Sequence, residues 1–333
     1  MDRMDFTQGV VRTRVIEKRL LSRAQFDRMV DAEDLEEVLR ILNETEYSSG
    51  ITKMKNPYDY ESVLSGELIR VYDLMRDVSV DGMVIDLLAL KYDYHNLKVL
   101  IKEKELKQDL SYLYLPIGAT DFDALKEAFE EGNLDEIPSS YRDAIKKVQE
   151  DYDETRDPQR IDLIFDRYYY QHFTAMAKES GIEFFLDYVK DMIDFTNVSS
   201  SIRLKRQGRD EKYFDDIIIP GGNIDRDTLF LIIKEPLNTL VKKFQDYRIS
   251  SSLSKGLASY EKTNRLTDFE KYKDDYLMEI NKLSKSVLFG PEPIFSYVAA
   301  KETEIKNLRI VMVSKVNHIS SEAIRERMRD LYV

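Results

Sequence analysis

The stretch Asp93-Tyr94-His95-Asn96-Leu97-Lys98 recurs in outline at Asp194-Phe195-Thr196-Asn197-Val198 and at Glu304-Ile305-Lys306-Asn307-Leu308-Arg309. In each copy an acidic residue precedes an asparagine by three positions, and the asparagines lie 101 and 110 residues apart. Residues three apart are neighbours on the surface of a helix, so each pair can form a local hydrogen bond. The element therefore predicts three related helices in one chain.

Apolar residues around this element also coincide when the three copies are superposed. They recur in steps of four, seven, three and four residues, which places them on one stripe of a helix. We expect this stripe to be the buried face of each long helix. Its positions are Met83, Phe184 and Ile294; Leu87, Tyr188 and Val298; Tyr94, Phe195 and Ile305; Leu97, Val198 and Leu308; and Ile101, Ile202 and Met312.

A second element follows the first two copies, at residues 116–125 and 220–229, with the shared pattern Pro-x-Gly-x-x-Asp-x-Asp-x-Leu. The glycine is typical of a tight turn and the first aspartate of a helix N-cap, so we expect caps here rather than a cation site. In the third copy Asn317 and Ser320 take these places, as a left-handed turn position and an N-cap permit.

Helix signals dominate the rest of the chain and predict an all-α fold with negligible β-structure. Two short stretches, 112–115 and 213–219, look extended, and two polar stretches, 149–159 and 250–268, are expected to be mobile loops or hinges. The expected helix starts are a capping box at Ser22 and Gln25, a cap at Asp31, a start at Pro57, an opening at Asp81, and residues 290–293, which open a helix reaching Val313.

Length and repetition together predict the domain organisation. Single hydrophobic cores usually stop growing near 250 to 300 residues, and this chain has 333. We expect one helical body of three pseudo-repeats around a central cavity. The pseudo-repeats are expected at about 1–132, 133–234 and 235–333.

Composition excludes several functional classes. The net charge of −12 argues against nucleic acid as a partner and against direct adhesion to anionic lipid. The chain has no cysteine, which excludes disulfides and thiolate metal sites. The N-terminus lacks a secretory signal, and no run of about 18 apolar residues is present. We expect a cytoplasmic protein that does not insert into a membrane and associates with one only through a partner.

No motif predicts catalysis. His95, His172 and His318 stand in unlike contexts without a second metal ligand at helical spacing, and the glycines near Pro220 lack the context of a phosphate cradle. We therefore expect no catalytic residue, no metal and no cofactor. The acid–asparagine pairs have two interpretations: they hold a helix against an adjacent loop, or they line a shared central surface.

Residues 290–293, running into Tyr297 and residues 300–309, resemble the C subunit of rotary V-type and A-type ATPases, called d in eukaryotes. Asp93-x-x-Asn96-Leu97-Lys98 and residues 19–22 extend the resemblance over essentially the whole chain. It implies a funnel of three helical units that acts, without catalysis, as a socket between the central shaft subunits (D and F type) and the membrane rotor ring (c/K-type proteolipid).

The same resemblance implies that the socket transmits torque between ATP hydrolysis or synthesis and the transport of Na⁺ or H⁺, and that the chain does not self-oligomerise. A general helical scaffold or adaptor is the alternative function, and a helical enzyme is the third.

A socket needs charged residues that face its cavity and contact the shaft. Lys91 and Glu302 hold equivalent places where the apolar stripe is interrupted, and we expect both to face the cavity. The full set of candidate cavity-lining or partner-contact residues is Lys91, Asp93, Asn96, Lys98, Lys301, Glu302, Glu304, Asn307 and Arg309.

Overall fold

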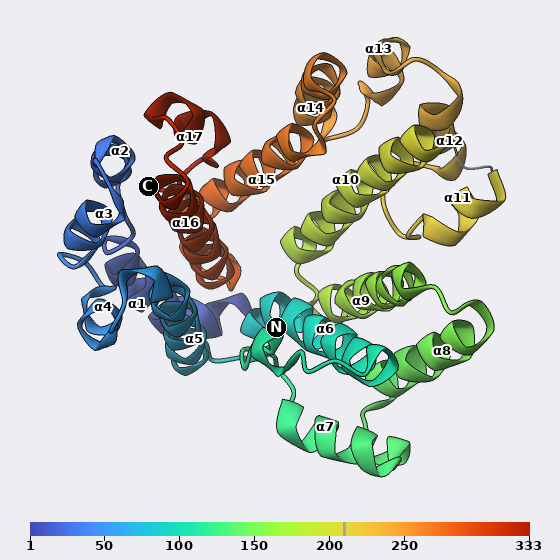
Figure 1. Ribbon diagram of the computed structural model, residues 1–333, viewed down its shortest axis with the longest axis horizontal. Helices are drawn as coiled ribbons and strands as arrows, with labels where there is room; N and C mark the ends of the chain where they lie inside the picture. Colours follow the sequence, from blue (N-terminus) through green and yellow to red (C-terminus); the bar gives the residue numbers. More distant parts are fainter. Residues whose placement is uncertain (209–210) are drawn as a thin grey trace. The chain divides into compact units, whose positions relative to one another are not determined.

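The computed structural model describes residues 1–208 and 211–333, and helices make up most of it (Figure 1). Seventeen α-helices are present within these two ranges, together with short 3-10 turns, and neither range contains a strand. The prediction of an all-α fold is therefore confirmed.

The chain divides into two compact units, which are described separately. Unit 1 combines Met1–Ile85 with Arg248–Val333, and unit 2 is Asp86–Tyr247. The division into three pseudo-repeats stays a prediction. Unit 1 holds α1 (Thr7–Glu17), α2 (Arg23–Asp31), α3 (Leu35–Leu42), α4 (Ser48–Lys53), α5 (Tyr60–Val78), α14 (Ser250–Thr263), α15 (Leu266–Leu283), α16 (Glu292–Val316) and α17 (Ser321–Arg327). Unit 2 holds α6 (Met83–Leu106), whose first turn belongs to unit 1, α7 (Phe122–Glu131), α8 (Ser139–Thr155), α9 (Pro158–Ser180), α10 (Glu183–Gln207), α11 (Glu211–Ile217), α12 (Arg226–Lys234) and α13 (Leu237–Leu240).

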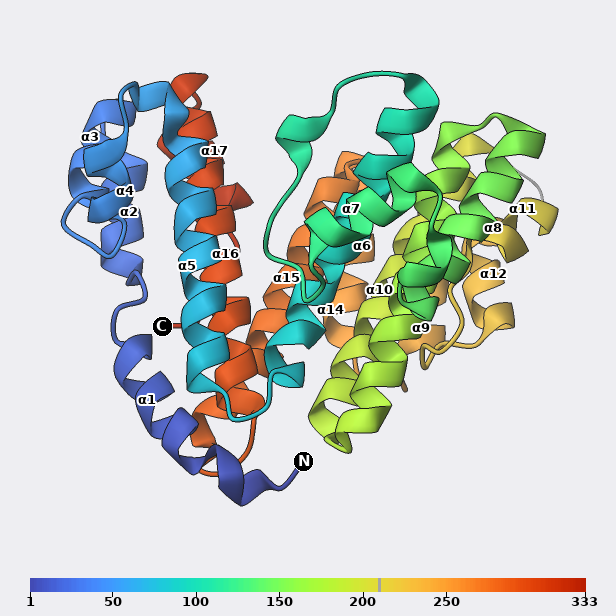
Figure 2. The same ribbon diagram turned by 90° about the horizontal axis from the view of Figure 1, so that it is seen from below.

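Helix α16 forms the centre of unit 1. Every residue from Pro291 to Lys301 is buried, because α1, α3, α5, α15 and α17 all pack against this helix. Figure 2 shows α5 and α16 side by side along their length. The helix starts at Glu292, as expected from residues 290–293, and continues three residues past the predicted end.

Unit 2 is built on α9, which packs against both α8 and α10, while α12 packs on α10. Aromatic rings of α6, α8 and α9 meet in its core: the Tyr94 ring lies 5.5 Å from that of Tyr141, 5.8 Å from Tyr169 and 6.3 Å from Phe165, centroid to centroid. The predicted apolar stripe is buried in all three long helices, except that Met83 and Phe184 in its first position are half-buried.

Both predictions of extended structure are wrong over the first part of each segment, although Tyr114 has an extended backbone with φ −67° and ψ 138°. Residues Ser111–Leu113 form a 3-10 turn and Glu211–Ile217 form α11. A lone extended segment leaves its backbone groups without partners, whereas a helical turn pairs them locally. Only the last residue of each segment, Leu115 or Ile219, makes strand-like bonds, and those bonds are to a side chain.

The predicted mobile loops are also wrong, because α8 continues to Thr155 and α14 fills Ser250–Thr263. Their polar residues lie on the exposed sides of amphipathic helices.

Cap predictions succeed in most places. Ser22 and Gln25 form the capping box, a 3-10 turn begins at Pro57 directly ahead of α5, and Asp81 accepts a hydrogen bond from the amide of Met83. Asp121, Asp225 and Ser320 cap α7, α12 and α17.

Two local predictions are wrong. The cap of α3 is Asp34, which accepts from the amide of Glu37 at 2.9 Å, whereas Asp31 ends α2 and pairs with Arg325. Asn317 has φ −97°, and the left-handed position is taken by His318 at φ 52°.

Candidate partner-contact site

The asparagine of each repeated element pairs with the backbone of one downstream residue through two hydrogen bonds. Asn96 donates from Nδ2 to the carbonyl of Leu115 at 2.8 Å and accepts at Oδ1 from the Leu115 amide at 2.9 Å. Asn197 pairs with Ile219 in the same way, at 2.8 and 2.9 Å, and Asn307 with Arg329 at 3.0 and 2.8 Å. The side-chain amide thus takes the place of a neighbouring strand's peptide group.

The acid of the first two copies binds the turn that follows. Asp93 accepts from the amides of Ala119 and Thr120 at 3.1 and 3.3 Å and from the Tyr141 hydroxyl at 3.0 Å. Asp194 accepts from the amides of Asn223 and Ile224 at 3.0 and 2.9 Å. We call each acid and asparagine, with the loop they hold, a clip.

The glycine shared by the two turns makes room for the carboxylate. A Cβ on Gly118 would lie 1.9 Å from Asp93 Oδ1, and one on Gly222 would lie 2.2 Å from Asp194 Oδ1. Gly118 and Gly222 are not among the residues with positive φ, so the requirement is for space rather than for a left-handed backbone. The two repeated sequence elements are therefore the two halves of one buried clip.

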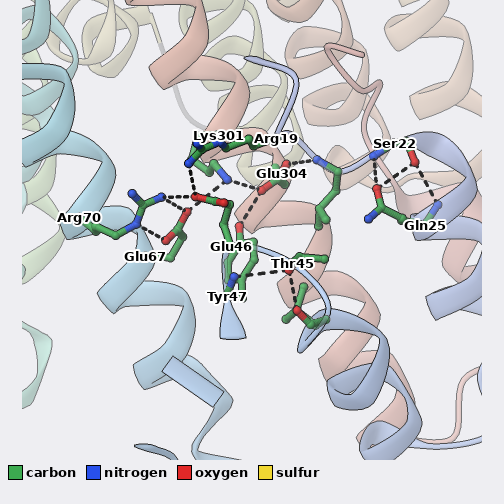
Figure 3. A network of polar contacts seen from close by, with 12 residues as sticks. Arg19, Ser22, Gln25, Thr45, Glu46, Tyr47, Glu67, Arg70, Lys301 and Glu304 are labelled. Carbon is green, nitrogen blue, oxygen red and sulfur yellow. Dashed lines mark hydrogen bonds and ion pairs between the residues drawn. The ribbon is translucent and has the colours of Figure 1, made fainter. Parts of the chain in front are cut away.

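The third copy keeps the asparagine pairing but directs its acid elsewhere. Glu304 accepts at Oε2 from the amide of Leu21 at 2.6 Å and at Oε1 from the Tyr47 hydroxyl at 2.8 Å (Figure 3). Its carboxylate also accepts from Lys301 Nζ at 2.7 Å. The N-terminal segments around Leu21 and Tyr47 thereby replace the Pro-x-Gly turn as the partner of the acid.

Lys301 is the cation at the centre of this network, and its side chain is only 1% exposed. Its Nζ lies 3.3 Å from Glu67 Oε1, and Glu67 in turn accepts two bonds from Arg70, at 2.7 and 2.8 Å (Figure 3). A buried charge is tolerated only when it is paired, and here two carboxylates flank the ammonium. The network joins α5, α16 and the residue just before α4.

Burial shifts the pKa values of the charged groups in the clips. Burial raises the pKa of Asp93 to about 6, although the Tyr141 hydroxyl and the amides of Ala119 and Thr120 favour the charged form. The pKa of Asp194 is raised for the same reason. Burial alone would lower the pKa of Lys301, but the carboxylates of Glu304 and Glu67 more than offset it, so the pKa is raised.

Five of the nine candidate residues are buried, and their polar groups bond inside their own unit: Asp93, Asn96, Lys301, Glu304 and Asn307. Of the two interpretations of the acid–asparagine pairs, these contacts favour the one in which a helix is held against a loop. The sequence pattern did not identify Tyr141, Tyr47 or Glu67 as partners of the clips.

The other four candidates are half-buried and each has a neighbour in its own unit. Lys98 donates to Asp166 at 2.5 Å, and Arg309 pairs with Glu61 at 2.5 and 3.0 Å. Of the other two candidates, Lys91 has its Nζ 5.2 Å from the Tyr92 ring centroid, and Glu302 accepts a hydrogen bond from the Tyr72 hydroxyl at 2.6 Å. Lys91 belongs to unit 2 and Glu302 to unit 1, so their place on one cavity stays a prediction.

Neither a metal site nor a membrane span is found in the described ranges. Residues 1–208 and 211–333 contain no group of three or more histidine and acidic side chains that could hold a metal ion. No helix in the same ranges is long and apolar enough to cross a membrane.

Comparison with known proteins identifies relatives along the whole chain. The family model described as ATP synthase (C/AC39) subunit matches residues 10–327. The C subunit of the V-type sodium ATPase of Enterococcus hirae is 29% identical over 95% of both chains. The C subunit of the A-type ATP synthase of Methanocaldococcus jannaschii is 26% identical over 96% of this chain and 85% of its own, and that of Archaeoglobus fulgidus is 24% identical over 96% and 94%.

Proposed function

Because the chain belongs to the ATP synthase (C/AC39) subunit family, we propose that it couples the rotor of a V-type or A-type ATPase. It is an accessory structural subunit rather than a catalytic one. In this role it joins the central shaft to the membrane rotor ring on the cytoplasmic face and passes torque between ATP turnover and the transport of Na⁺ or H⁺.

The clips are the observation that best supports this role. A coupling element has to resist deformation, and close-packed interiors transmit strain. Each of the long helices α6, α10 and α16 is held by a clip partway along its length, and α16 alone is about 37 Å long at 1.5 Å per residue. Buried side-chain bonds at these points oppose sliding of a helix against its loop.

Co-purification tests the proposed partners. We expect a tagged chain, extracted with detergent from membranes that hold the complex, to recover both shaft subunits and ring subunits. Recovery of only unrelated soluble proteins would favour the helical adaptor instead.

Transport tests the proposed role. Membrane complexes reconstituted with the chain are expected to drive ion uptake at the expense of ATP, and complexes without it to hydrolyse ATP with little uptake. Equal uptake in both preparations would contradict a coupling function. Restoring uptake by adding back the purified chain is the matching control.

A further inference from the structure

A cavity in unit 2 is lined by residues other than those of the clips. It has a volume of about 380 Å³ and lies between α8 and α9, with Asp216 of α11 among its lining residues. Figure 1 shows α8 and α9 side by side. Cavities of roughly 300 to 1,000 Å³ are typical of sites for small molecules, so this one is large enough to hold a ligand.

One face of α9 forms most of the cavity wall. Its lining residues recur in steps of three and four, which places them along one side of the helix: Arg160, Leu163, Ile164, Arg167, Tyr168 and Gln171. Leu163, Ile164 and Tyr168 are only half-buried, so the cavity offers apolar surface between its two arginines.

Contacts within unit 2 hold both arginines in place. Arg160 donates to both carboxylate oxygens of Asp151 at 2.6 Å, and its Nη1 lies 3.6 Å from Asp216 Oδ2. Nη2 of Arg167 donates to three backbone carbonyls around the end of α11, at 2.9 to 3.1 Å. A ligand therefore meets guanidinium groups that are already ordered, which lowers the entropy cost of binding.

The carboxylates that line the cavity leave two of its cations over. Asp151 and Asp216 both pair with Arg160, at 2.6 and 3.6 Å. In the described ranges, neither carboxylate forms an ion pair with Lys147 or Arg167. This local excess of positive charge occurs in a chain whose net charge is −12, and it favours an anionic ligand.

Hydrogen-bond donors are left over in the cavity as well. Lys147 Nζ lies 4.0 Å from the exposed Glu150, and exposed pairs of this kind contribute little. Nε and Nη1 of Arg167, the Tyr168 hydroxyl and the Gln171 amide make no hydrogen bond to any part of the chain that the structure describes. A phosphate group accepts several such bonds at once, and its oxygens match the fork of an arginine.

We propose that this cavity binds a small phosphate monoester with an apolar organic part. The three terminal oxygens of the phosphate give separate acceptors to Lys147, Arg167 and Tyr168, whereas a carboxylate has only two oxygens. Leu163 and Ile164 contact the organic part. The site goes beyond the coupling role, and its failure would leave that role untouched.

Calorimetric titration of the purified full chain with phenyl phosphate tests the ligand class. We expect saturable binding, and at least about tenfold weaker binding of inorganic phosphate, phenol or benzoate, because each lacks one part of the recognised group. Added salt should weaken the binding of phenyl phosphate. Equal affinity for any of the three other compounds, or no binding of phenyl phosphate at about 10 mM, would overturn the proposal.

Substitution of the exposed lysine tests the site without disturbing the core. Lys147→Gln is expected to lower the affinity for phenyl phosphate about tenfold, and Lys147→Arg to retain most of it. The matched control is Lys146→Gln, which removes another exposed lysine from α8 that does not line the cavity. An equal loss in both glutamine variants would indicate nonspecific attraction and overturn the site.

Thiol labelling locates the bound ligand. The chain contains no cysteine, so Gln171→Cys and Lys146→Cys each carry a single thiol, inside and outside the cavity. Saturating phenyl phosphate is expected to slow the reaction of Gln171→Cys with a maleimide and to leave that of Lys146→Cys unchanged. A rate for Gln171→Cys that does not change with ligand would place the binding elsewhere and overturn the proposal.

Discussion

At the scale of single residues, space for a carboxylate decides where glycine stands in the clips. Gly118 and Gly222 hold equivalent positions in two turns, and in each an aspartate oxygen occupies the volume that a Cβ would need. The carboxylate reaches backbone amides that a side chain at the glycine would cover. The matched glycines in the sequence signal this approach rather than an unusual backbone angle.

We predict that Gly118→Ala lowers the free energy of unfolding by about 2–4 kcal/mol, because it displaces Asp93 from two amides in a buried site. The control is Gly66→Ala in α5, where nothing lies within 4 Å of the new Cβ and stability should rise by up to about 1 kcal/mol. Urea unfolding of both variants measures the difference. Equal effects would show that Asp93 does not depend on the space at Gly118.

The raised pKa of Asp93 predicts the direction in which the stability of the protein changes with pH. The folded chain holds this proton more tightly than the unfolded chain, since burial raises the pKa from 3.8 to about 6. The stabilisation that protonated Asp93 gives to the folded state is thus present below about pH 4, and it is lost as the pH rises through 6. Between pH 4 and 7, we expect the free energy of unfolding of the wild type to fall by up to about 3 kcal/mol relative to that of Asp93→Asn.

Tyr141→Phe tests whether Asp93 causes this pH dependence, because the Tyr141 hydroxyl donates to Asp93 and lowers its pKa. Its removal should move the midpoint of the pH dependence above 6. A pH profile that is the same in wild type and Asp93→Asn would assign the proton to another group.

At the scale of helices, the third clip shows how a repeated element acquires new partners. A glutamate replaces the aspartate, and its extra methylene extends the carboxylate to Leu21, Tyr47 and Lys301. The result joins α5, α16 and the N-terminal segments through buried charge instead of through a turn. The helix therefore keeps the loop contact of Asn307 and gains a second attachment.

We predict that Lys301→Met lowers the free energy of unfolding by about 3–5 kcal/mol, because it leaves the buried carboxylates of Glu67 and Glu304 without their common cation. Arg309→Met on the same helix is the control. Its pair with Glu61 is 43% and 53% exposed, and such pairs contribute about 0–1 kcal/mol. Thermal unfolding measures both, and similar losses would contradict a stabilising role for the buried network.

What could be predicted from the sequence was local. Helix stripes and most caps depend on residues a few positions apart, so spacing alone revealed them. Spacing also suggested a local bond within each acid–asparagine pair, whereas the bonds of Asn96, Asn197 and Asn307 go to backbone groups 19 to 22 residues away. The partners of Glu304 could not be predicted, since Leu21 and Tyr47 are 283 and 257 residues away. Polar composition misidentified α14 as a loop, because burial of one face by α15 outweighs a weak apolar pattern.

At the scale of the whole molecule, the chain builds two compact units from three segments, since unit 2 interrupts unit 1. The clips of α6 and α10 lie in unit 2 and the clip of α16 lies in unit 1. Each unit therefore has its own buried hydrogen bonds and its own apolar core.

We predict that calorimetry resolves two unfolding transitions, because each unit buries its own core. Gly118→Ala should lower the temperature of one transition and Lys301→Met that of the other, and the two effects should add because the sites share no partner. Equal displacement of both transitions by either variant would show that the units unfold as one.

The paths of the N-terminal helices also determine when the protein can finish folding during synthesis. Residues up to Ile85 pack on α16 and hold its Glu304 and Lys315, yet α16 is synthesised only after the whole of unit 2. At about 5 to 20 residues per second, unit 2 is complete on the order of ten seconds before α16 and α17 are available. Residues 1–85 thus wait for their partners until α16 has been made, and nascent chains need protection of α1 to α5 during that interval.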